Sequence, residues 1–348
     1  MKLVFRVAIS LLLTGSFIYL FARRFDVGAA GRALREASPL LVGGSLLVNL
    51  AAYLIRAWRW RVLMAPVKKR IGMYNLTSTM FIGFMVSFLV PFRLGEVVRP
   101  VLLARREKVS TTATIATVAL ERLFDVMTVM ALLLVYVLTS RGADVMASGN
   151  GAEADQAAVF VRHAVVGVGA LVAVALPLVI VLVLFPKAFA RPLKALHGRG
   201  HGGIAARISG TIEKLVAGLG VMRSRKRLAQ AVALSFLMWL VIDWSILLGV
   251  RAFNLPLQFS DSLLLVVPLG VGIVMPTPGG VGPYEYLCQV SLAGFWNVDQ
   301  ASAAAAAITL HAVTLLPTIA LGLLFMWMGG VRMADFRKMA RIKEGAGP

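Results

Sequence analysis

The sequence is poor in the residues and motifs that build disulfide-bonded, metal-bound or nucleotide-driven domains. It has a single cysteine, Cys288, which excludes an intramolecular disulfide and a CxxC motif. The phosphate-binding pattern GxxxxGK(S/T) does not occur, so nucleotide-driven activity is not expected. The apolar segments contain no HxxxH metal pair, and the chain has no nucleophile elbow. We therefore expect no cofactor and no metal site.

Acidic residues are also scarce, because 16 Asp and Glu residues accompany 36 Lys and Arg, for a net charge of +20. The basic residues lie mostly in short segments that flank apolar runs, which is typical of topology signals and contacts with anionic lipid. We therefore expect no nucleic-acid partner. Hydrophobic residues make up 59% of the chain and the mean hydropathy is +0.83. Without the short alternating strands of a β-barrel, these values predict an all-α polytopic membrane protein.

Six apolar stretches are long enough to cross a bilayer. A helix needs roughly 20 mostly apolar residues to span the hydrocarbon core. The first stretch has some features of a signal peptide, but Arg23 and Arg24 follow its apolar part directly, so we interpret it as a retained span. The six predicted transmembrane helices lie at about 4–22, 40–62, 111–139, 163–185, 228–250 and 301–328.

Two further apolar stretches are interrupted and fit poorly as single spans. The first, about 74–104, is broken at Pro91 and Pro100, and the second, about 260–296, is broken in the segment MPTPGGVGP. Each limb has roughly 10–17 residues, so at about 1.5 Å per residue it crosses only part of a core of roughly 30 Å. Two short limbs around such a break predict a re-entrant helical hairpin, whose backbone must be surrounded by protein or water.

The charges of the loops indicate the sides of the membrane. The basic loop 187–227, with an amphipathic helix predicted over 204–222, and the basic tail 329–348 are expected in the cytoplasm. The loop 140–162 carries acidic residues and is expected outside. Six spans with both termini in the cytoplasm satisfy these assignments, whereas the loop 23–39, with four arginines, lands outside and does not fit.

We expect residues 1–348 to form one integral-membrane domain. On the expected topology the first hairpin enters from the cytoplasmic side and the second from the outer side. Each hairpin is preceded and followed by a span. Half 1, about 40–139, and half 2, about 228–328, would then form an inverted repeat, an architecture that many transporters build around a site at the bilayer midplane.

The first hairpin has charged residues where the chain should be deepest in the membrane. Arg93, Glu96 and Arg99 follow one another at intervals of three residues, which predicts that they share one helical face. An ionised group at the centre of a membrane helix costs around 2.5–3.5 kcal/mol on insertion scales. Internal pairing that only holds helices together is one interpretation. The coincidence of charge with a backbone break favours the other, a substrate-binding site.

A second charged group lies in the stretch ALERLFDVM of the third predicted span. Glu121 and Asp125 are i,i+4 neighbours, and Arg122 can reach Asp125 at i+3. Glu121 is then the acid that Arg122 compensates less, so we expect it to act as a proton carrier, with Glu285 as the second candidate. Structural pairing is again the alternative.

The second break combines prolines and glycines with one acid. Its glycines allow close approach of the backbone to a ligand, and a half-helix that starts there directs unpaired N–H groups inward. With Arg93 and Arg99, these features predict a site for an anion such as a phosphate, whereas a tight turn without a ligand is the alternative. The candidate residues at this break are Pro276, Thr277, Gly279, Gly280, Gly282 and Glu285.

Two other features are open to more than one interpretation. The segment RAWRWRVLM, which includes Arg59 and Trp60, is interpreted as an aromatic-belt anchor at the membrane interface, with headgroup recruitment as the alternative. Asp243 lies alone in WLVIDWSIL, and we expect its carboxylate to face a cavity or to bond a neighbouring Trp or Ser.

The motifs PFRLGEVVRP, ALERLFDV and PTPGGVGPYE occur in this order, and through them the chain resembles the lysylphosphatidylglycerol synthase transmembrane family, from about residue 10 to 330. That family includes the flippase half of the bacterial multiple peptide resistance factor, so the resemblance implies movement of a lipid between leaflets. The aminoacyl-transferase domain often fused to it is not expected here, because about 20 residues follow the last predicted span. The family's motif positions are matched by Arg93, Gly95, Glu96, Arg99, Glu121, Arg122, Asp125, Pro276, Pro278, Gly279, Gly280, Gly282 and Glu285.

The expected function is that of a lipid flippase or transporter in the bacterial inner membrane. A phosphate-bearing headgroup of a phospholipid or other anionic lipid would enter between the hairpins, with passive or proton- or ion-coupled transport. One alternative is an integral-membrane enzyme that modifies a lipid or a lipid-linked sugar. A regulatory or structural subunit is another, and a homodimer is an assembly that the sequence allows.

Overall fold

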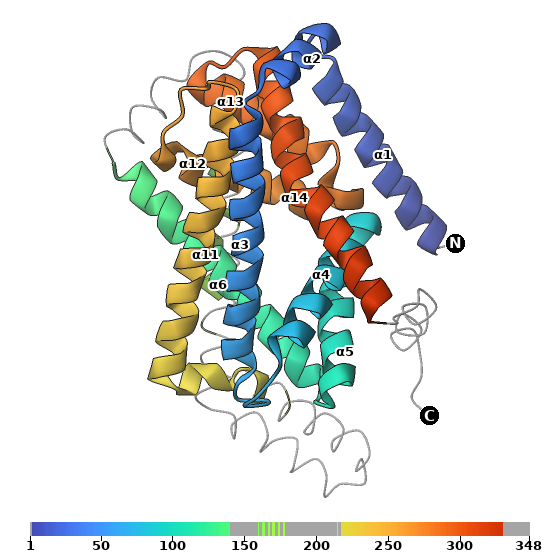
Figure 1. Cartoon of the computed structure of the whole chain (residues 1–348), viewed down its shortest axis with the longest axis vertical. Helices are drawn as coiled ribbons and strands as arrows, with labels where there is room; N and C mark the ends of the chain where they lie inside the picture. The colour runs from blue at the N-terminus through green and yellow to red at the C-terminus, as the bar shows by residue number, and fades with distance from the viewer. Residues whose placement is uncertain are drawn as a thin grey trace, which may run out of the picture.

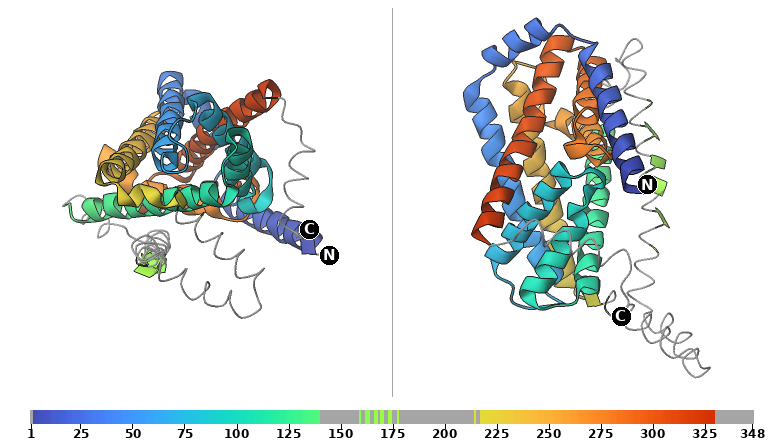
Figure 2. Two further views of the ribbon diagram at one scale, coloured as in Figure 1. Left: turned by 90° about the horizontal axis from the view of Figure 1, so that it is seen from below. Right: turned by 90° about the vertical axis from the view of Figure 1, so that its right-hand side faces the viewer.

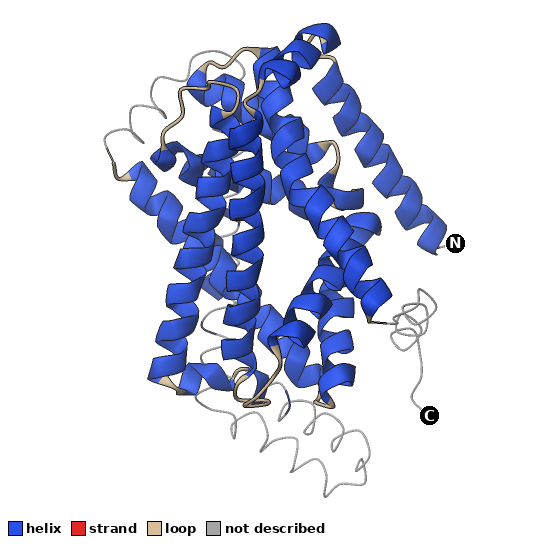
Figure 3. Ribbon diagram, in the orientation of Figure 1, coloured by secondary structure: helices blue, strands red, loops and turns tan. Residues whose placement is uncertain are grey.

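All regular secondary structure in the described part of the chain is helical (Figure 3). The computed structural model describes residues 2–139 and 217–329, together with isolated positions between 159 and 214. The all-α expectation is confirmed for these residues. The helices are α1 (Lys2–Ala22), α2 (Val27–Glu36), α3 (Pro39–Met64), α4 (Met73–Leu89), α5 (Gly95–Glu107), α6 (Thr111–Val137), α11 (Arg225–Arg251), α12 (Phe259–Val274), α13 (Pro283–Trp296) and α14 (Gln300–Met328), with the 3-10 turns η1 (Pro91–Arg93), η2 (Gly220–Arg223) and η3 (Pro278–Gly280).

Three long helices begin where the sequence supplies a polar cap. Ser38, Ser110 and Asp299 precede α3, α6 and α14, and each side chain accepts a hydrogen bond from a backbone N–H of the first turn. Pro39 is the first residue of α3, a position where its missing N–H removes no helical hydrogen bond. Local sequence therefore sets where these helices start.

Among the described residues, three helices, α3, α11 and α14, are long and apolar enough to cross a membrane, and the pair α1 and α2, bent by 81°, gives a fourth if it is one span. α6 is as long, with 27 residues, but has Glu121, Arg122 and Asp125 near its middle. α1, α3, α6, α11 and α14 occupy five of the six ranges predicted as spans. The sixth, 163–185, lies outside the described residues apart from isolated positions, as do most of the loop 187–227 and the tail beyond Gly329.

The segment 23–39 is mostly helix, whereas the sequence interpretation treats it as a loop. α2 packs against α14, and the Asp26 carboxylate caps it by accepting a hydrogen bond from the Ala29 N–H at 2.6 Å. Arg32 and Arg35, two of the arginines that disturb the expected topology, therefore lie on a helix that packs against the bundle.

The two interrupted stretches form helical hairpins, since α4 packs against α5 and α12 packs against α13. At the first break Phe92 and Arg93 have positive φ angles of 63° and 51°, and at the second Gly279, Gly280 and Gly282 have φ of 64°, 79° and 92°. The first hairpin lies towards the lower end of the pair α3 and α11 and the second towards the upper end (Figures 1 and 2). The hairpins thus occupy opposite ends of the molecule.

Pro100 does not break the first hairpin, contrary to the expectation from sequence. α5 continues through it from Gly95 to Glu107. A proline within a helix removes one i to i−4 hydrogen bond, here the one to the carbonyl of Glu96. The packing of α5 on α4 and α6 keeps the helix continuous in spite of that loss, and the break lies at η1 alone.

α3 and α11 pack side by side in opposite directions (Figure 1). Ser45 and Ser245 each donate a hydrogen bond to the other's carbonyl oxygen, at 2.7 and 2.8 Å. Further along α3, Arg59 bonds Ser235, which is earlier in α11, so the helices are antiparallel. Around this pair, α4 packs on α14 as α12 packs on α6. Each of these contacts joins one half to the other, and the two use equivalent helices, so the contact that half 1 makes through α4 has a counterpart in the contact that half 2 makes through α12.

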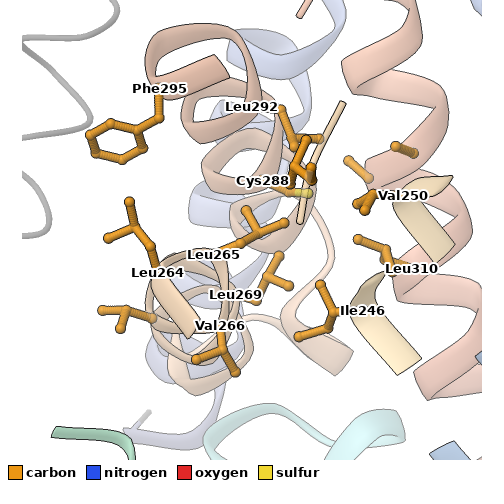
Figure 4. Packing of buried hydrophobic residues seen from close by; sticks show 14 of the residues in the cluster. Ile246, Val250, Leu264, Leu265, Val266, Leu269, Cys288, Leu292, Phe295 and Leu310 are labelled. Carbon is orange, nitrogen blue, oxygen red and sulfur yellow. The ribbon is translucent and has the colours of Figure 1, made fainter. Parts of the chain in front are cut away.

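Apolar side chains of α11, α12, α13 and α14 form the largest core cluster. Figure 4 shows Cys288 among Leu265, Leu292, Val250 and Leu310. The thiol is free and buried, and it packs there as a small hydrophobic group. This core joins the second hairpin to the antiparallel pair.

Candidate functional site

Four charged side chains form a buried cluster between α3, α5 and α6. Arg99 of α5 contacts both carboxylate oxygens of Glu121 on α6, with Nη1 lying 3.4 Å from Oε1. Arg59 of α3 lies 2.7 Å from Asp125 and 3.4 Å from Glu121. None of the four side chains is more than 6% exposed. We call Arg59, Arg99, Glu121 and Asp125 the inner cluster.

Two tryptophans pack against the inner cluster. The guanidinium carbon of Arg99 lies 4.2 Å from the ring centroid of Trp60, a cation–π contact, and Trp60 Nε1 donates to Thr117 at 3.2 Å. Trp239 of α11 donates from Nε1 to Asp125 at 3.3 Å. The charged groups are therefore both paired and enclosed, which restricts their movement.

Three charged side chains next to the inner cluster are partly exposed. Glu96 lies 3.5 Å from Arg93 and 3.2 Å from Arg122, and Arg122 also lies 3.1 Å from Asp125. The side chains of Arg93, Glu96 and Arg122 are 27%, 23% and 34% exposed. We call these three residues the rim, because they connect the inner cluster with the surface.

Arginines outnumber carboxylates in this region. Arg56 of α3 lies over the rings of Tyr53 and Phe84, at 5.8 and 5.2 Å, and forms no ion pair among the described residues. With Arg56, the rim and the inner cluster contain five arginines and three carboxylates, an excess of two positive charges. Arg122 Nε also has no hydrogen-bond partner in the described part of the chain. An anion with several acceptor oxygens, such as a phosphate, would complement this excess.

The second break carries a different pair. His311 of α14 places Nδ1 2.5 Å from Oε1 of Glu285 on α13, and its Nε2 lies 2.9 Å from the Gly279 carbonyl oxygen. The other carboxylate oxygen of Glu285 accepts a hydrogen bond from the Gly282 N–H at 2.8 Å. Tyr284 stacks on the imidazole with 4.4 Å between ring centroids. Glu285 and His311 therefore tie the break to α14.

The glycines of the second break lie against protein. A Cβ on Gly282 would lie 3.1 Å from the Thr14 carbonyl oxygen in α1, and one on Gly279 would lie 3.3 Å from the Phe88 carbonyl oxygen in α4. η1 and η3 are also in contact, so the two breaks meet. The sequence predicts that these glycines let a ligand approach the backbone. In the structure, the lack of a Cβ at Gly279 and Gly282 instead lets α4 and α1 pack against the break.

Some polar groups of the second half have no hydrogen-bond partner within the described residues. Among them are the hydroxyl of Thr277 and both carboxylate oxygens of Asp243, all buried. The bond from Asp243 to a neighbouring Trp or Ser, one of the two expectations, is therefore not found there. The Pro276 carbonyl oxygen accepts a hydrogen bond from Ser10 of α1 at 2.7 Å.

The structure brings the predicted residues of the first hairpin and of α6 together, whereas Glu285 pairs separately with His311. Arg93 lies in η1, before α5, so it does not continue the helical face of Glu96 and Arg99. As predicted, Arg122 lies closer to Asp125, at 3.1 Å, than to Glu121, at 4.0 Å. The conclusion that this leaves Glu121 poorly compensated is wrong. Both Arg59 and Arg99 lie within 3.4 Å of its carboxylate, because other helices supply cations that the sequence of α6 cannot reveal.

Two residues of the site escape the sequence interpretation. Arg59 belongs to a segment interpreted as an interfacial anchor, yet its side chain is fully buried. His311 follows an alanine-rich apolar run in α14. In each case the available signal is a titratable or charged side chain inside an otherwise apolar helix, at a depth where ionisable groups are costly and tend to be functional.

Comparison with known proteins agrees with the motifs that form this site. The chain is 28% identical, over 328 residues, to the protein named Glycosyltransferase AglD of Haloferax volcanii. The match covers 87% of this chain and 51% of that protein, so the chain spans about half the length of the curated relative that it matches. Residues 5–322 match the family described as the lysylphosphatidylglycerol synthase TM region. Because this match covers nearly the whole chain, the protein belongs to that family, as the three ordered motifs predict.

Proposed function

We propose that this protein is a lipid flippase or transporter that moves a lipid with a phosphate-bearing headgroup between membrane leaflets. The headgroup would bind at the rim while the acyl chains stay in the bilayer. The observation that carries the proposal is the rim itself. Arg93 and Arg122 are partly exposed and share one carboxylate, Glu96, next to a buried cluster whose charges are already paired.

The proposed architecture has six spans and two re-entrant hairpins in an inverted repeat. The limbs α4, α5, α12 and α13 have 17, 13, 16 and 14 residues. At about 1.5 Å per residue each is shorter than a hydrocarbon core of roughly 30 Å. The antiparallel α3 and α11, the matching contacts of the halves and the opposite positions of the hairpins support the inverted arrangement.

Headgroup binding would exchange one anion for another. A phosphate that approaches the rim can accept charge-assisted hydrogen bonds from Arg93 and Arg122 in place of Glu96. The excess of two positive charges favours this exchange. The inner cluster would hold the position of Arg122 through Asp125, which Arg59 and Trp239 also contact. Rim residues thus bind the substrate, and inner residues position them.

The remaining expectations from sequence become part of the proposal. We place the protein in the bacterial inner membrane with both termini in the cytoplasm, in line with the basic loop 187–227 and the basic tail 329–348. Transport would be passive or ion-coupled. The partner would be a phospholipid or another anionic lipid, and the protein could act as a monomer or as a homodimer.

The full chain, reconstituted in vesicles that contain fluorescently labelled phosphatidylglycerol, tests the proposal. Dithionite bleaches only the outer leaflet, so the bleached fraction reports lipid movement. Arg93→Gln and Arg122→Gln should each slow the movement about tenfold or more, because each removes a charge-assisted bond to phosphate. Arg105→Gln serves as the matched control, since Arg105 is an exposed arginine of the same α5 helix.

Thermal unfolding of each variant in detergent separates binding from folding. Arg93→Gln should unfold within a few degrees of the wild-type temperature, because the Arg93 side chain is partly exposed and its single ion pair among the described residues is a long one. Wild-type protein that moves no more lipid than empty vesicles would refute the proposal for this lipid class. Equal rates for wild type and both rim variants would refute the rim as the binding site.

A second candidate function is an integral-membrane enzyme acting on a lipid-linked sugar. The relative of about twice this chain's length carries the name glycosyltransferase, which favours it. In that case Glu96 or Glu285 would act as an acid or base. Incubation of the purified protein with lipid extracts and sugar donors, followed by mass spectrometry, would give a new glycolipid mass. Lipid movement without a new mass supports the transporter.

A further inference from the structure

The two halves contain equivalent carboxylate–cation pairs. In half 1, Glu96 lies in the first turn of α5 and pairs with Arg122, the twelfth residue of α6, which begins at Thr111. In half 2, Glu285 lies in the first turn of α13 and pairs with His311, the twelfth residue of α14, which begins at Gln300. Each pair joins the second limb of a hairpin to the helix that follows it.

The two pairs differ in one chemical property. Arginine keeps its positive charge at every physiological pH, whereas histidine gains and loses a proton between about pH 5 and pH 8. The pair of half 1 is thus permanently ionic, and the pair of half 2 depends on the protonation of His311.

The two contacts of the His311 ring each need a proton. Nε2 must carry one to bond the Gly279 carbonyl, and a second must lie on Nδ1 or on the Glu285 carboxylate. A carbonyl oxygen can only accept, so Nε2 carries a hydrogen and donates it to Gly279. Nδ1 lies 2.5 Å from Oε1 of Glu285, a separation at which a lone pair cannot face a carboxylate without a proton between them. One exchangeable proton therefore occupies the position between Nδ1 and Oε1.

We infer that His311 and Glu285 form a proton-binding site through which proton binding is coupled to lipid movement, an inference that rests on the proposed transport function. With the proton present, the imidazole joins Glu285 to the Gly279 carbonyl and holds the second break against α14. When the proton leaves to water, the Nδ1 lone pair and the carboxylate repel each other and this connection is lost. The proton is released from Nδ1, and no other bond is made or broken.

The position of the pair links it to the rim. Gly279 belongs to η3, which contacts η1, and η1 contains Arg93. Loss of the contact between Nδ1 and Glu285 frees one side of the imidazole that holds η3, and so acts on the contact between the two breaks. The pair Glu96–Arg122 stays ionic, whereas the pair Glu285–His311 changes when it gains or loses a proton. The two hairpins would therefore favour one arrangement with the proton bound and another without it.

The titratable side chains closest to the pair come from α13 and α3. α13 contributes Tyr284, stacked on the imidazole, and Cys288, three residues after Glu285 on the same helix. α3 contributes Tyr53, which bonds Thr318 farther along α14. α4 has no acidic or basic residue. Among the described residues, no charged side chain of the packed helices α2, α3 and α11 forms an ion pair with His311 or Glu285. The charged residues of these three helices are Arg32, Arg35, Glu36, Arg56, Arg59, Arg61, Arg225, Lys226, Arg227, Asp243 and Arg251.

The test uses the full chain in vesicles with labelled phosphatidylglycerol, assayed between about pH 6 and pH 8. The wild-type rate should change at least about fivefold across this interval, because histidine changes its charge there. His311→Gln and Glu285→Gln should abolish that change. His311→Arg reproduces the permanent cation of half 1 and should also give a rate that is independent of pH. This variant replaces His311→Gln in the test if His311→Gln does not fold. His163→Gln, a control at an exposed histidine, should leave the profile unchanged.

A measurement that needs no transport separates the two proposals. The imidazole ¹⁵N signals of the four histidines can be followed by NMR against pH in nanodiscs, where His311→Gln identifies the signal of His311 by its loss. Glu285→Gln should displace the pH dependence of that signal. A His311 signal that does not change with pH, or a transport profile that survives in all three variants, overturns the proton site while the transport function stands. A His311 signal that titrates in protein that moves no lipid overturns the transport function and the coupling with it.

Discussion

The guanidinium of Arg59 on α3 lies 2.7 Å from the carboxylate of Asp125 on α6, and both side chains are buried. Arg59 also contacts Glu121, so it compensates two acids at once. Removing it would take the nearest cation from Asp125 and one of the cations next to Glu121, in a buried region where an incompletely paired charge is costly. The sequences of α3 and α6 do not predict this ionic contact between the two helices.

Arg59→Gln should destabilise the protein by about 3–5 kcal/mol, because it breaks a buried ion pair by removing one partner. The expected readout is a lower folded yield and a lower unfolding temperature in detergent. Arg61→Gln is the matched control on the same helix, since Arg61 is exposed. If Arg59→Gln unfolds at the wild-type temperature, the inner cluster is not a stabilising element.

Gly95→Ala should force the limbs of the first hairpin apart. A Cβ on Gly95 would lie 1.7 Å from the carbonyl oxygen of Gly83, a backbone atom that cannot yield without a shift of α4. Overpacking of this kind costs typically about 1–3 kcal/mol or more. Gly270→Ala is the matched control, because a Cβ there meets no atom within 4 Å. Equal unfolding temperatures for the two variants would show that the limbs are not in close contact.

Cysteine accessibility tests the re-entrant hairpins. The native Cys288 is buried, so a membrane-impermeant thiol reagent should label only introduced cysteines. Tyr74→Cys and Arg105→Cys, at the open end of the first hairpin, should label from the cytoplasmic side. Gln258→Cys and Asn297→Cys, at the open end of the second, should label from the other side. Labelling of Tyr74→Cys and Arg105→Cys from opposite sides would make residues 74–104 a full span and disprove the inverted repeat.

Asp299, which caps α14, should stabilise the protein in a pH-dependent manner. Partial burial acts to raise the pKa of Asp299, but hydrogen bonds from the N–H groups of Ser302 and Ala301 outweigh it and lower that pKa below its usual value. A carboxyl whose pKa is lower in the folded state stabilises the fold above its unfolded pKa. This contribution is lost as the pH falls through the folded value.

Asp299→Ala should therefore cost about 0.5–2 kcal/mol near neutral pH, the usual range for an N-cap, and less in acid. Unfolding temperatures of wild type and variant across the pH range from neutral to acid would show the two curves converging. Ser302→Ala keeps the backbone N–H that donates to Asp299 but removes a hydroxyl that also bonds it, so it should reduce the pH dependence less than Asp299→Ala does. A difference that stays constant down to acid pH would contradict the capping role.

Local chemistry accounts for much of what the sequence predicts correctly. Runs of apolar residues predict the positions of α3, α11 and α14 because the length of a membrane helix follows from the thickness of the bilayer. Positive φ angles at Gly279, Gly280 and Gly282 belong to the break itself, so the glycine-rich stretch indicates it. Arg122 and Asp125 pair as predicted, because i,i+3 neighbours share a helical face. Pro100 misleads because packing on neighbouring helices overrides its local preference.

Partners that lie on different helices are decided only by the tertiary structure. The sequence of α6 alone assigns Glu121 too little compensation, because Arg59 and Arg99 reach it from α3 and α5. His311 appears as an isolated residue in an apolar helix until the second break places Glu285 beside it. The sequence by itself therefore determined where the helices run and where they break, since hydropathy, capping and backbone preference act over a few residues. Which charges meet depends on the packing of segments far apart in the chain, and only the folded arrangement sets those distances.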